Sequence, residues 1–169
     1  RQKHLSMNSK SFHLDAQQIF EQISFGPLVD DLARMHRESP ADLQDMLLEQ
    51  AGQMGKDYCL IRAAWQGGAA LGVKIASVFP ANVSHDLPAI HAAYILFDGA
   101  NGVPVRSIDG NALTYLKTAA DSALGSRLLA RPDSQRLLMV GAGAMAPYLI
   151  EAHCTVHPQI EEIRAWNRS

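Results

Sequence analysis

The sequence is poor in cysteine. Its two cysteines, Cys59 and Cys154, are far apart in the chain, and neither belongs to a Cys-x-x-Cys pair or a His-rich cluster. This spacing gives no basis for a metal site. Both residues lie among apolar neighbours, which indicates core thiols in a reducing cytosol.

The sequence also lacks an excess of charge of either sign and a long apolar run. Its 15 Lys and Arg nearly balance 17 Asp and Glu, so it has no general attraction for nucleic acid or acidic membranes. No apolar run approaches the roughly 20 residues of a membrane span, and residues 1–4 do not lead into a signal-peptide core. A cytoplasmic protein that binds a small or nucleotide ligand is expected.

What is present suits a globular protein, because 47% of the 169 residues are hydrophobic and 19% are charged. In the first third, apolar residues recur at helical spacing from Asp15 to about Met54. We expect two or three helices there. Gly26-Pro27 would interrupt them, Ser39-Pro40 would end one of them, and residues 42–54 would form the last.

After Lys56 the pattern changes to short runs of β-branched and aromatic residues separated by turn signals. These runs predict an antiparallel meander with strands over 58–65, 71–79, 92–98 and 103–108. Helical spacing returns over 113–130, where Arg131-Pro132 ends the helix. The predicted apolar face of this helix carries Leu113, Leu116, Ala120, Ala123, Leu124 and Leu128.

A glycine-rich turn follows a buried parallel strand predicted over 136–140. Gly141-Ala142-Gly143-Ala144-Met145-Ala146 has the form G-x-G-x-x-A and leads into a helix through His153, with a second strand at 163–166. Gly141 would allow the tight turn, Gly143 the approach of a pyrophosphate, and Ala146 close helix packing. The free N–H groups at the helix N-terminus would hold the phosphate charge. Ala144 and Met145 complete the predicted cofactor loop.

The second strand ends in Asn167-Arg168-Ser169, where an NAD-specific site usually carries an acid. A cation and hydrogen-bond donors suit a ribose 2′-phosphate instead, so NADP is the expected cofactor and NAD remains possible. Arg168 as a solvated loop residue stays open as an alternative.

Many short motifs stand in one order along the chain, and together they resemble the ornithine cyclodeaminase and mu-crystallin family. The resemblance covers residues 60–169 well and the N-terminal helices loosely. The motifs are Gly72-Val73-Lys74-Ile75, Phe79-Pro80-Ala81-Asn82, Leu87-Pro88-Ala89, Leu96-Phe97-Asp98-Gly99, Gly102-Val103-Pro104, Asp109-Gly110, Leu113-Thr114, Lys117-Thr118-Ala119-Ala120, Ser122-Ala123-Leu124 and Gly141-Ala142-Gly143.

The resemblance implies an α/β fold in two parts. Residues 1–112 would be an α+β substrate-binding and dimerisation domain containing the meander. Residues 113–169 would begin an NAD(P)-binding Rossmann domain, represented by its first βαβ unit alone and continuing beyond Ser169. The resemblance also implies a homodimer and hydride transfer at the α-carbon of an amino or cyclic imino acid, as in ornithine cyclodeaminase or ketimine reductase.

The same resemblance makes Lys74 the catalytic lysine. A lysine on an apolar strand is poorly solvated, which favours its neutral form and suits proton exchange with an amine or imine nitrogen. A strand-edge lysine that reaches water is the alternative. Lys117 stands where many members carry a carboxylate-binding arginine, and Thr118 stands at a cofactor contact.

Further candidates for binding substrate charge are Arg62 and the pair His36-Arg37, although plain surface positions suit them better. The segment by itself is not expected to turn over substrate. The alternative function is a nucleotide-binding protein without catalysis, either a fragment or a crystallin-like NADPH binder.

Overall fold

The computed structural model describes residues 12–168, which form two compact units. The first unit contains residues 42–110 and the segment that ends at Asp15. The second contains residues 16–41 and the chain from Asn111 onward. Each unit has its own fold and its own group of candidate site residues.

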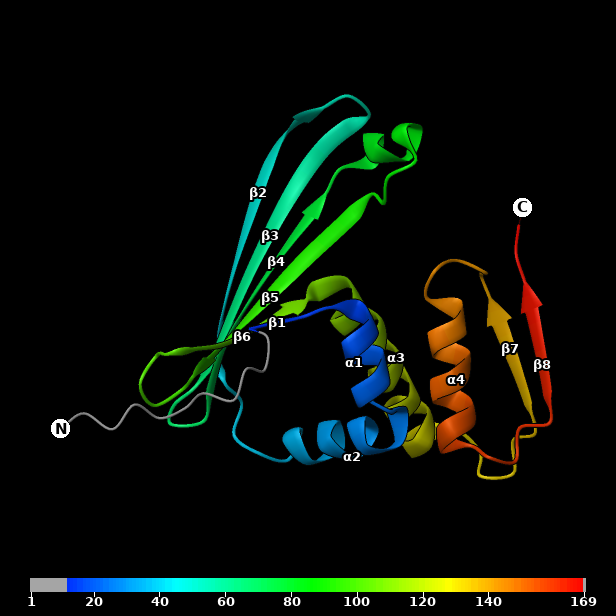
Figure 1. The fold of residues 1–169 in the computed structure, drawn as a ribbon. Helices are drawn as coiled ribbons and strands as arrows, with labels where there is room; N and C mark the ends of the chain where they lie inside the picture. Colours follow the sequence, from blue (N-terminus) through cyan, green and yellow to red (C-terminus); the bar gives the residue numbers. More distant parts are fainter. Residues whose placement is uncertain (1–11, 169) are drawn as a thin grey trace. The chain divides into compact units, whose positions relative to one another are not determined.

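The first unit is a six-stranded sheet with the order β1-β6-β5-β4-β3-β2 (Figure 1). Strands β2 to β6 are antiparallel neighbours, which confirms the predicted meander, while β1 pairs parallel with β6. The strands are β1 (His13–Leu14), β2 (Asp42–Gly52), β3 (Gly55–Gln66), β4 (Ala70–Val78), β5 (Ile90–Asp98) and β6 (Pro104–Asp109), and the 3₁₀ helix η1 (Pro80–His85) lies between β4 and β5.

The helix predicted over 42–54 is wrong, because this segment forms β2 and the start of a hairpin. Gly52 pairs with Gly55 across a two-residue loop. Gly55 has a φ of 110°, a backbone angle that residues other than glycine rarely adopt. The run Met46-Leu47-Leu48 suits a helix or a strand equally well. Pairing with the distant strand β3 decides between them, and all of β2 except Gly52 is exposed along this sheet edge.

The turn predicted over residues 99–102 connects β5 to β6. The Asp98 side chain accepts hydrogen bonds from the backbone N–H groups of Ala100 (2.8 Å) and Asn101 (3.1 Å). Gly102 has a φ of 73°, so it supplies the left-handed residue that closes the turn. These local contacts explain why this connection could be predicted from the sequence.

The second unit contains four helices and a two-stranded parallel sheet among its described residues. The helices are α1 (Ala16–Gln22), α2 (Phe25–Met35), α3 (Gly110–Leu129) and α4 (Ala146–Val156), and the strands are β7 (Arg136–Val140) and β8 (Glu162–Trp166). The α3 residue Gly110 belongs to the first unit. This element order confirms the predicted helix, strand, helix and strand after residue 112.

The core of the second unit is built largely from small side chains on α3. Val29 of α2 is fully buried, and Leu116 and Ala120 of α3 are almost completely buried. Alanines let helices approach closely, which explains the dense packing around α3. The predicted apolar face is correct except at its end, where Leu128 is 72% exposed.

Strand β7 is parallel to β8 as predicted, but its predicted burial is wrong. Leu138 and Val140 are 63% and 67% exposed, and Trp166 of β8 is 58% exposed. Along β7 the exposed Leu138 and Val140 alternate with the more buried Leu137 and Met139. Helix α4 packs on this strand (Figure 1).

Cys59 and Cys154 are both half-buried free thiols. Among the described residues, no group of three or more His, Cys, Asp or Glu side chains is placed to hold a metal ion. No helix within residues 12–168 is long and apolar enough to cross a membrane.

Candidate functional site

The G-x-G-x-x-A segment forms the tight connection between β7 and α4. Gly141 has a φ of 108°, and its N–H donates to the carbonyl oxygen of Trp166 at 2.7 Å. The N–H of Ala146, the first residue of α4, donates to the carbonyl oxygen of Gly143 at 2.9 Å. The turn is therefore tied to the end of β8 and to the start of the helix.

Gly143 lies where the turn is open. A Cβ atom built on it would meet no described atom within 4 Å. The N-cap residue of α4, Met145, makes no side-chain capping hydrogen bond, and Ala144 is exposed. An uncapped helix start beside an open glycine fits a phosphate group, because backbone N–H groups and the helix dipole both favour negative charge there.

The end of β8 borders the same turn. The Asn167 oxygen Oδ1 accepts a hydrogen bond from the N–H of Ala142 at 3.4 Å, and Arg168 is exposed. Ser169, the third residue predicted to contact the cofactor, lies outside the described residues. The structure therefore brings Asn167 to the predicted phosphate loop, and Arg168 follows it in the chain.

In the first unit, a transverse row of polar side chains crosses one face of the sheet. Cross-strand pairing places Asp45 opposite Arg62, Arg62 opposite Lys74, and Lys74 opposite Tyr94. Directly paired residues point to the same face, so these four side chains form a continuous row, which we call the polar row. One acid, two cations and a phenol are thus collected from β2, β3, β4 and β5.

Arg62 is engaged within the polar row. Its Nε and Nη2 atoms donate to the two carboxylate oxygens of Asp45, at 2.7 and 2.6 Å. The arginine lowers the pKa of Asp45, chiefly through this hydrogen bonding. Arg62 can bind a substrate carboxylate only if it shares or releases Asp45.

Lys74 is half-buried and lies between Gly72 and Ala76 on the same face of β4. A Cβ atom on Gly72 would overlap the hydroxyl oxygen of Tyr94, so glycine makes room for this ring. Burial raises the pKa of Tyr94. The phenol therefore stays protonated at neutral pH beside the predicted catalytic lysine.

The second unit carries Lys117 and Thr118 on consecutive exposed positions of α3. Lys117 forms an ion pair with Asp121, one helical turn further along. Both line a hollow of about 430 Å³ that also contains His36. Arg37 instead donates from Nε to the carbonyl oxygen of Ala33 at 3.1 Å. The structure thus separates the His36-Arg37 pair and places only His36 near Lys117.

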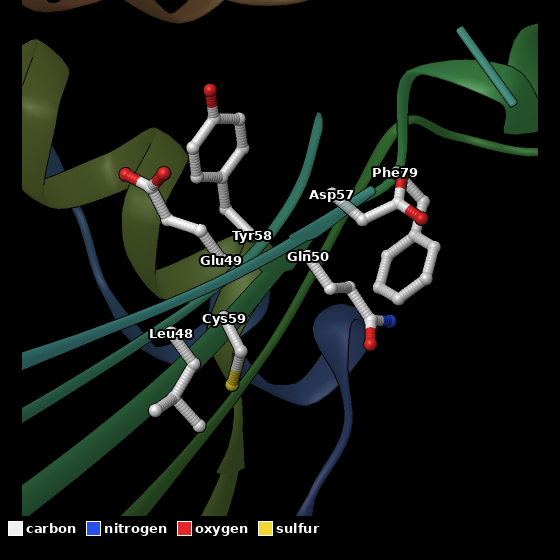
Figure 2. Close-up of a pocket in the computed structure, with 7 residues that line it drawn as sticks. All are labelled: Leu48, Glu49, Gln50, Asp57, Tyr58, Cys59 and Phe79. Atoms are coloured by element: carbon white, nitrogen blue, oxygen red, sulfur yellow. The ribbon is translucent and has the colours of Figure 1, made fainter. Parts of the chain in front are cut away.

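A second hollow, of about 180 Å³, lies beside the β2–β3 hairpin and contains none of the predicted site residues. In Figure 2, Glu49 and Tyr58 point to the opposite side of the strands from Leu48 and Cys59. The residues around the hollow therefore come from both faces of the sheet at its edge, and their polar groups do not converge on one point.

Sequence reasoning missed Asp45 and Tyr94. Asp45 fell in the segment predicted as a helix, and Tyr94 in a strand whose pairing was unknown. The signal that identifies both is the register with Arg62 and Lys74, which only the paired sheet provides.

A glycine turn between a parallel strand and an uncapped helix, followed by a second parallel strand, defines a Rossmann-type βαβ unit. The profile of the Ornithine cyclodeaminase/mu-crystallin family matches residues 40–169, and the chain belongs to this family.

Comparison with individual proteins agrees with this assignment. The chain is 38% identical over 147 residues to Delta(1)-pyrroline-2-carboxylate reductase from Paracoccus denitrificans, which covers 86% of this chain and 45% of that protein. The structure is also similar to that of a lysine cyclodeaminase, which was solved to explain its recognition of L-lysine, L-ornithine and L-2,4-diaminobutyric acid. The two chains are 25% identical and superpose with a TM-score of 0.77, over 95% of this chain and 50% of that one.

The fold is also that of Thermococcus litoralis Delta(1)-pyrroline-2-carboxylate reductase in complex with NADH and L-proline. Its TM-score is 0.81 at 24% identity, over 94% of this chain and 50% of that chain. The present chain spans half or less of the length of these three proteins.

Proposed function

We propose that this protein acts as an NAD(P)-dependent enzyme that transfers hydride at the α-carbon of an amino or cyclic imino acid. The observation that carries the proposal is Lys74 in the middle of the polar row, in a chain of this family that also has an open glycine turn. Reduction of a cyclic ketimine is the favoured direction, because the Paracoccus relative is named as a pyrroline-2-carboxylate reductase. The lysine cyclodeaminase supports cyclodeamination as the second candidate.

The glycine turn fits the cofactor. Gly141, Gly143, Ala144, Met145 and Ala146 would form the loop around the pyrophosphate, with Thr118 as a further contact. The N–H groups of Gly143, Ala144 and Met145 would donate to it, because those of Gly141 and Ala146 already donate to Trp166 and Gly143. A bound dinucleotide would supply or accept the hydride. Asn167, Arg168 and Ser169 are proposed to read the ribose 2′-phosphate, which favours NADP(H) over NAD(H). The charge of Arg168, which is exposed and directly follows Asn167, supports this preference.

Lys74 is proposed to exchange a proton with the substrate nitrogen. In the reductive direction the α-carbon gains hydride and the nitrogen gains a proton, so an amine replaces the C=N bond. A lysine on a half-buried strand is suited to donate that proton and to be recharged from solvent.

Lys117 is proposed to bind the substrate carboxylate. It retains the charge of an arginine but not the bidentate fork, so its hold on the carboxylate is less rigid. Its ion pair with Asp121 would have to open or be shared. Arg62 is a weaker candidate for binding the carboxylate, because its Nε and Nη2 atoms already donate to Asp45.

The division of labour between the parts of the chain belongs to the same proposal. Residues 1–112 would bind substrate and form a homodimer in the cytoplasm, and residues 113–169 would begin the cofactor domain. Residues 1–169 alone would not turn over substrate. The second function class, a nucleotide binder without catalysis, is tested by the same experiment.

That experiment follows NADPH and NADH oxidation by the intact protein with Delta(1)-pyrroline-2-carboxylate and its six-membered homologue. Ammonia release from L-ornithine and L-lysine is measured in parallel. NADPH oxidation with the cyclic imines supports the reductase, and ammonia release supports the cyclodeaminase. Binding of NADPH without either reaction would replace the enzyme by the binding protein.

A further inference from the structure

We infer that Tyr94 contacts the substrate, with its phenol O–H donating a hydrogen bond to the carboxylate of the amino or imino acid beside Lys74. This inference rests on the proposed function and assigns a further substrate-binding residue to it. Tyr94 carries no motif that distinguishes it in the sequence, and its place in the sheet is what assigns the role.

The register places Tyr94 directly across from Lys74. Antiparallel partners on one face have Cβ atoms about 5 Å apart, so a ligand atom that reaches the Lys74 side chain is within reach of the Tyr94 side chain. The absence of a side chain at Gly72 lets the Tyr94 hydroxyl lie over β4. The ring is therefore directed towards β4, with its hydroxyl at Gly72, which precedes Lys74 by two residues on the same face.

Tyr94 is half-buried, and no hydrogen bond to its hydroxyl is found within residues 12–168. No buried side-chain oxygen among the described residues is without a partner, so the hydroxyl of this half-buried side chain is accessible and can bond to a ligand. Burial also raises the pKa of the phenol, which keeps the proton available for donation. A protonated, partly desolvated donor suits an anionic oxygen.

The other side of the polar row is already balanced. Asp45 holds Arg62 through two hydrogen bonds, so the charges of these two side chains offset one another at the β2–β3 end. At the β5 end the neighbour of Lys74 is an uncharged donor. A substrate carboxylate therefore meets no acidic side chain at the Tyr94 position of the row.

The test compares the intact wild-type protein with Tyr94→Phe, which keeps the ring over Gly72 and removes only the hydroxyl. We expect KM for Delta(1)-pyrroline-2-carboxylate to rise about tenfold or more, the usual effect of losing a hydrogen bond to a charged group. NADPH affinity should not change. Tyr58→Phe is the matched control, since Tyr58 is also half-buried on the same face but lies outside the polar row.

A second measurement separates contact with the carboxylate from a structural effect. Binding of L-proline and of L-prolinamide is measured calorimetrically in the presence of NADP⁺. Tyr94→Phe should weaken L-proline binding about tenfold and leave L-prolinamide binding unchanged, because the amide lacks the anionic oxygens.

Three results would overturn the inference. Wild-type turnover of cyclic imines with an unchanged KM in Tyr94→Phe removes Tyr94 from the site and leaves the proposed function intact. An equal loss for proline and prolinamide shows that the hydroxyl supports the fold of the sheet. If the wild type turns over neither imines nor diamino acids, the proposed function fails, and the inference fails with it.

Discussion

The side-chain oxygen of Asn167 accepts a hydrogen bond from the backbone N–H of Ala142, and so links the end of β8 to the glycine turn. Asn167 thus has a local structural contact in addition to its proposed contact with the cofactor. Asparagine and aspartate both supply the accepting oxygen, whereas only aspartate adds a negative charge.

Asn167→Asp should shift the cofactor preference towards NADH. The link to Ala142 is kept, but the new carboxylate repels a 2′-phosphate and can accept from a ribose hydroxyl. Asn167→Leu, which removes the acceptor, should weaken both cofactors. Fluorescence titration with NADPH and NADH measures the two affinities. Wild-type affinity for both cofactors in Asn167→Asp, together with weakening of both in Asn167→Leu, would show that the residue acts only through the turn.

Arg168→Ala should weaken NADPH binding by roughly ten- to a hundredfold, since a charge-assisted hydrogen bond contributes about 1.5 to 3 kcal/mol. NADH binding should stay nearly unchanged. Arg164→Ala is the matched control, because Arg164 is an exposed arginine of β8 that pairs with Glu162. Wild-type binding of NADH as tight as that of NADPH would contradict the predicted preference.

Gly143→Val should abolish dinucleotide binding without unfolding the protein. A Cβ atom at this position meets no described atom within 4 Å, so the added side chain would obstruct the incoming pyrophosphate and not the chain itself. Gly67→Val is the control, because Gly67 is equally open and lies in the β3–β4 turn. Circular dichroism checks the fold, and unchanged NADPH affinity in Gly143→Val would reduce the motif to a simple turn.

Lys74→Ala in the intact protein should lower turnover by a factor on the order of 100 or more, the usual contribution of general acid-base catalysis. Dinucleotide affinity should be nearly unchanged, because the residues proposed to hold the cofactor do not include Lys74. Lys56→Ala is the control, since Lys56 is an exposed β3 lysine paired with Glu49. Wild-type turnover by Lys74→Ala would exclude the catalytic role.

Stability should fall in mild acid because of two histidines at the C-terminal end of α4, His153 in its last turn and His157 directly after it. The two rings lie one helical turn apart and face α3. His153 forms a hydrogen bond with Ser122 (3.2 Å), and His157 forms one with Ser126 (2.8 Å). Burial, and then the charge of His157, lowers the pKa of His153 below the 6.5 of a free imidazole. The contribution of His153 to the stability of the native state is therefore fully present above pH 6.5. It is lost as the pH falls towards the lowered pKa, because the unfolded chain binds the proton first.

Urea unfolding from pH 8 to pH 5 measures this effect. The midpoint should decline less steeply below pH 6.5 in His153→Gln than in the wild type. His85→Gln serves as the control, because His85 is an exposed residue of η1. Identical pH profiles for the wild type and His153→Gln would show that His153 does not cause the loss of stability in acid.

Local sequence determined the features that depend on neighbouring residues. Gly141 and Gly143 follow a β strand and precede a helix, so the turn could be predicted directly from their spacing. The same holds for the β5–β6 turn, which is closed by hydrogen bonds within residues 98–103, although Gly99 also bonds to Trp65, Gly68 and Ala69. Short-range backbone geometry is encoded where it occurs.

Only the tertiary structure decided what depends on distant pairing. Residues 42–52 are compatible with a helix until β3 supplies the partner for eleven backbone positions, and the register of that pair joins Asp45 to Arg62. The neighbours of Lys74 come from strands whose alignment is set by the whole sheet, so Tyr94 gains a role that its local sequence does not show. A one-residue shift would move each of these side chains to the opposite face, which is why register can decide the chemistry of a site.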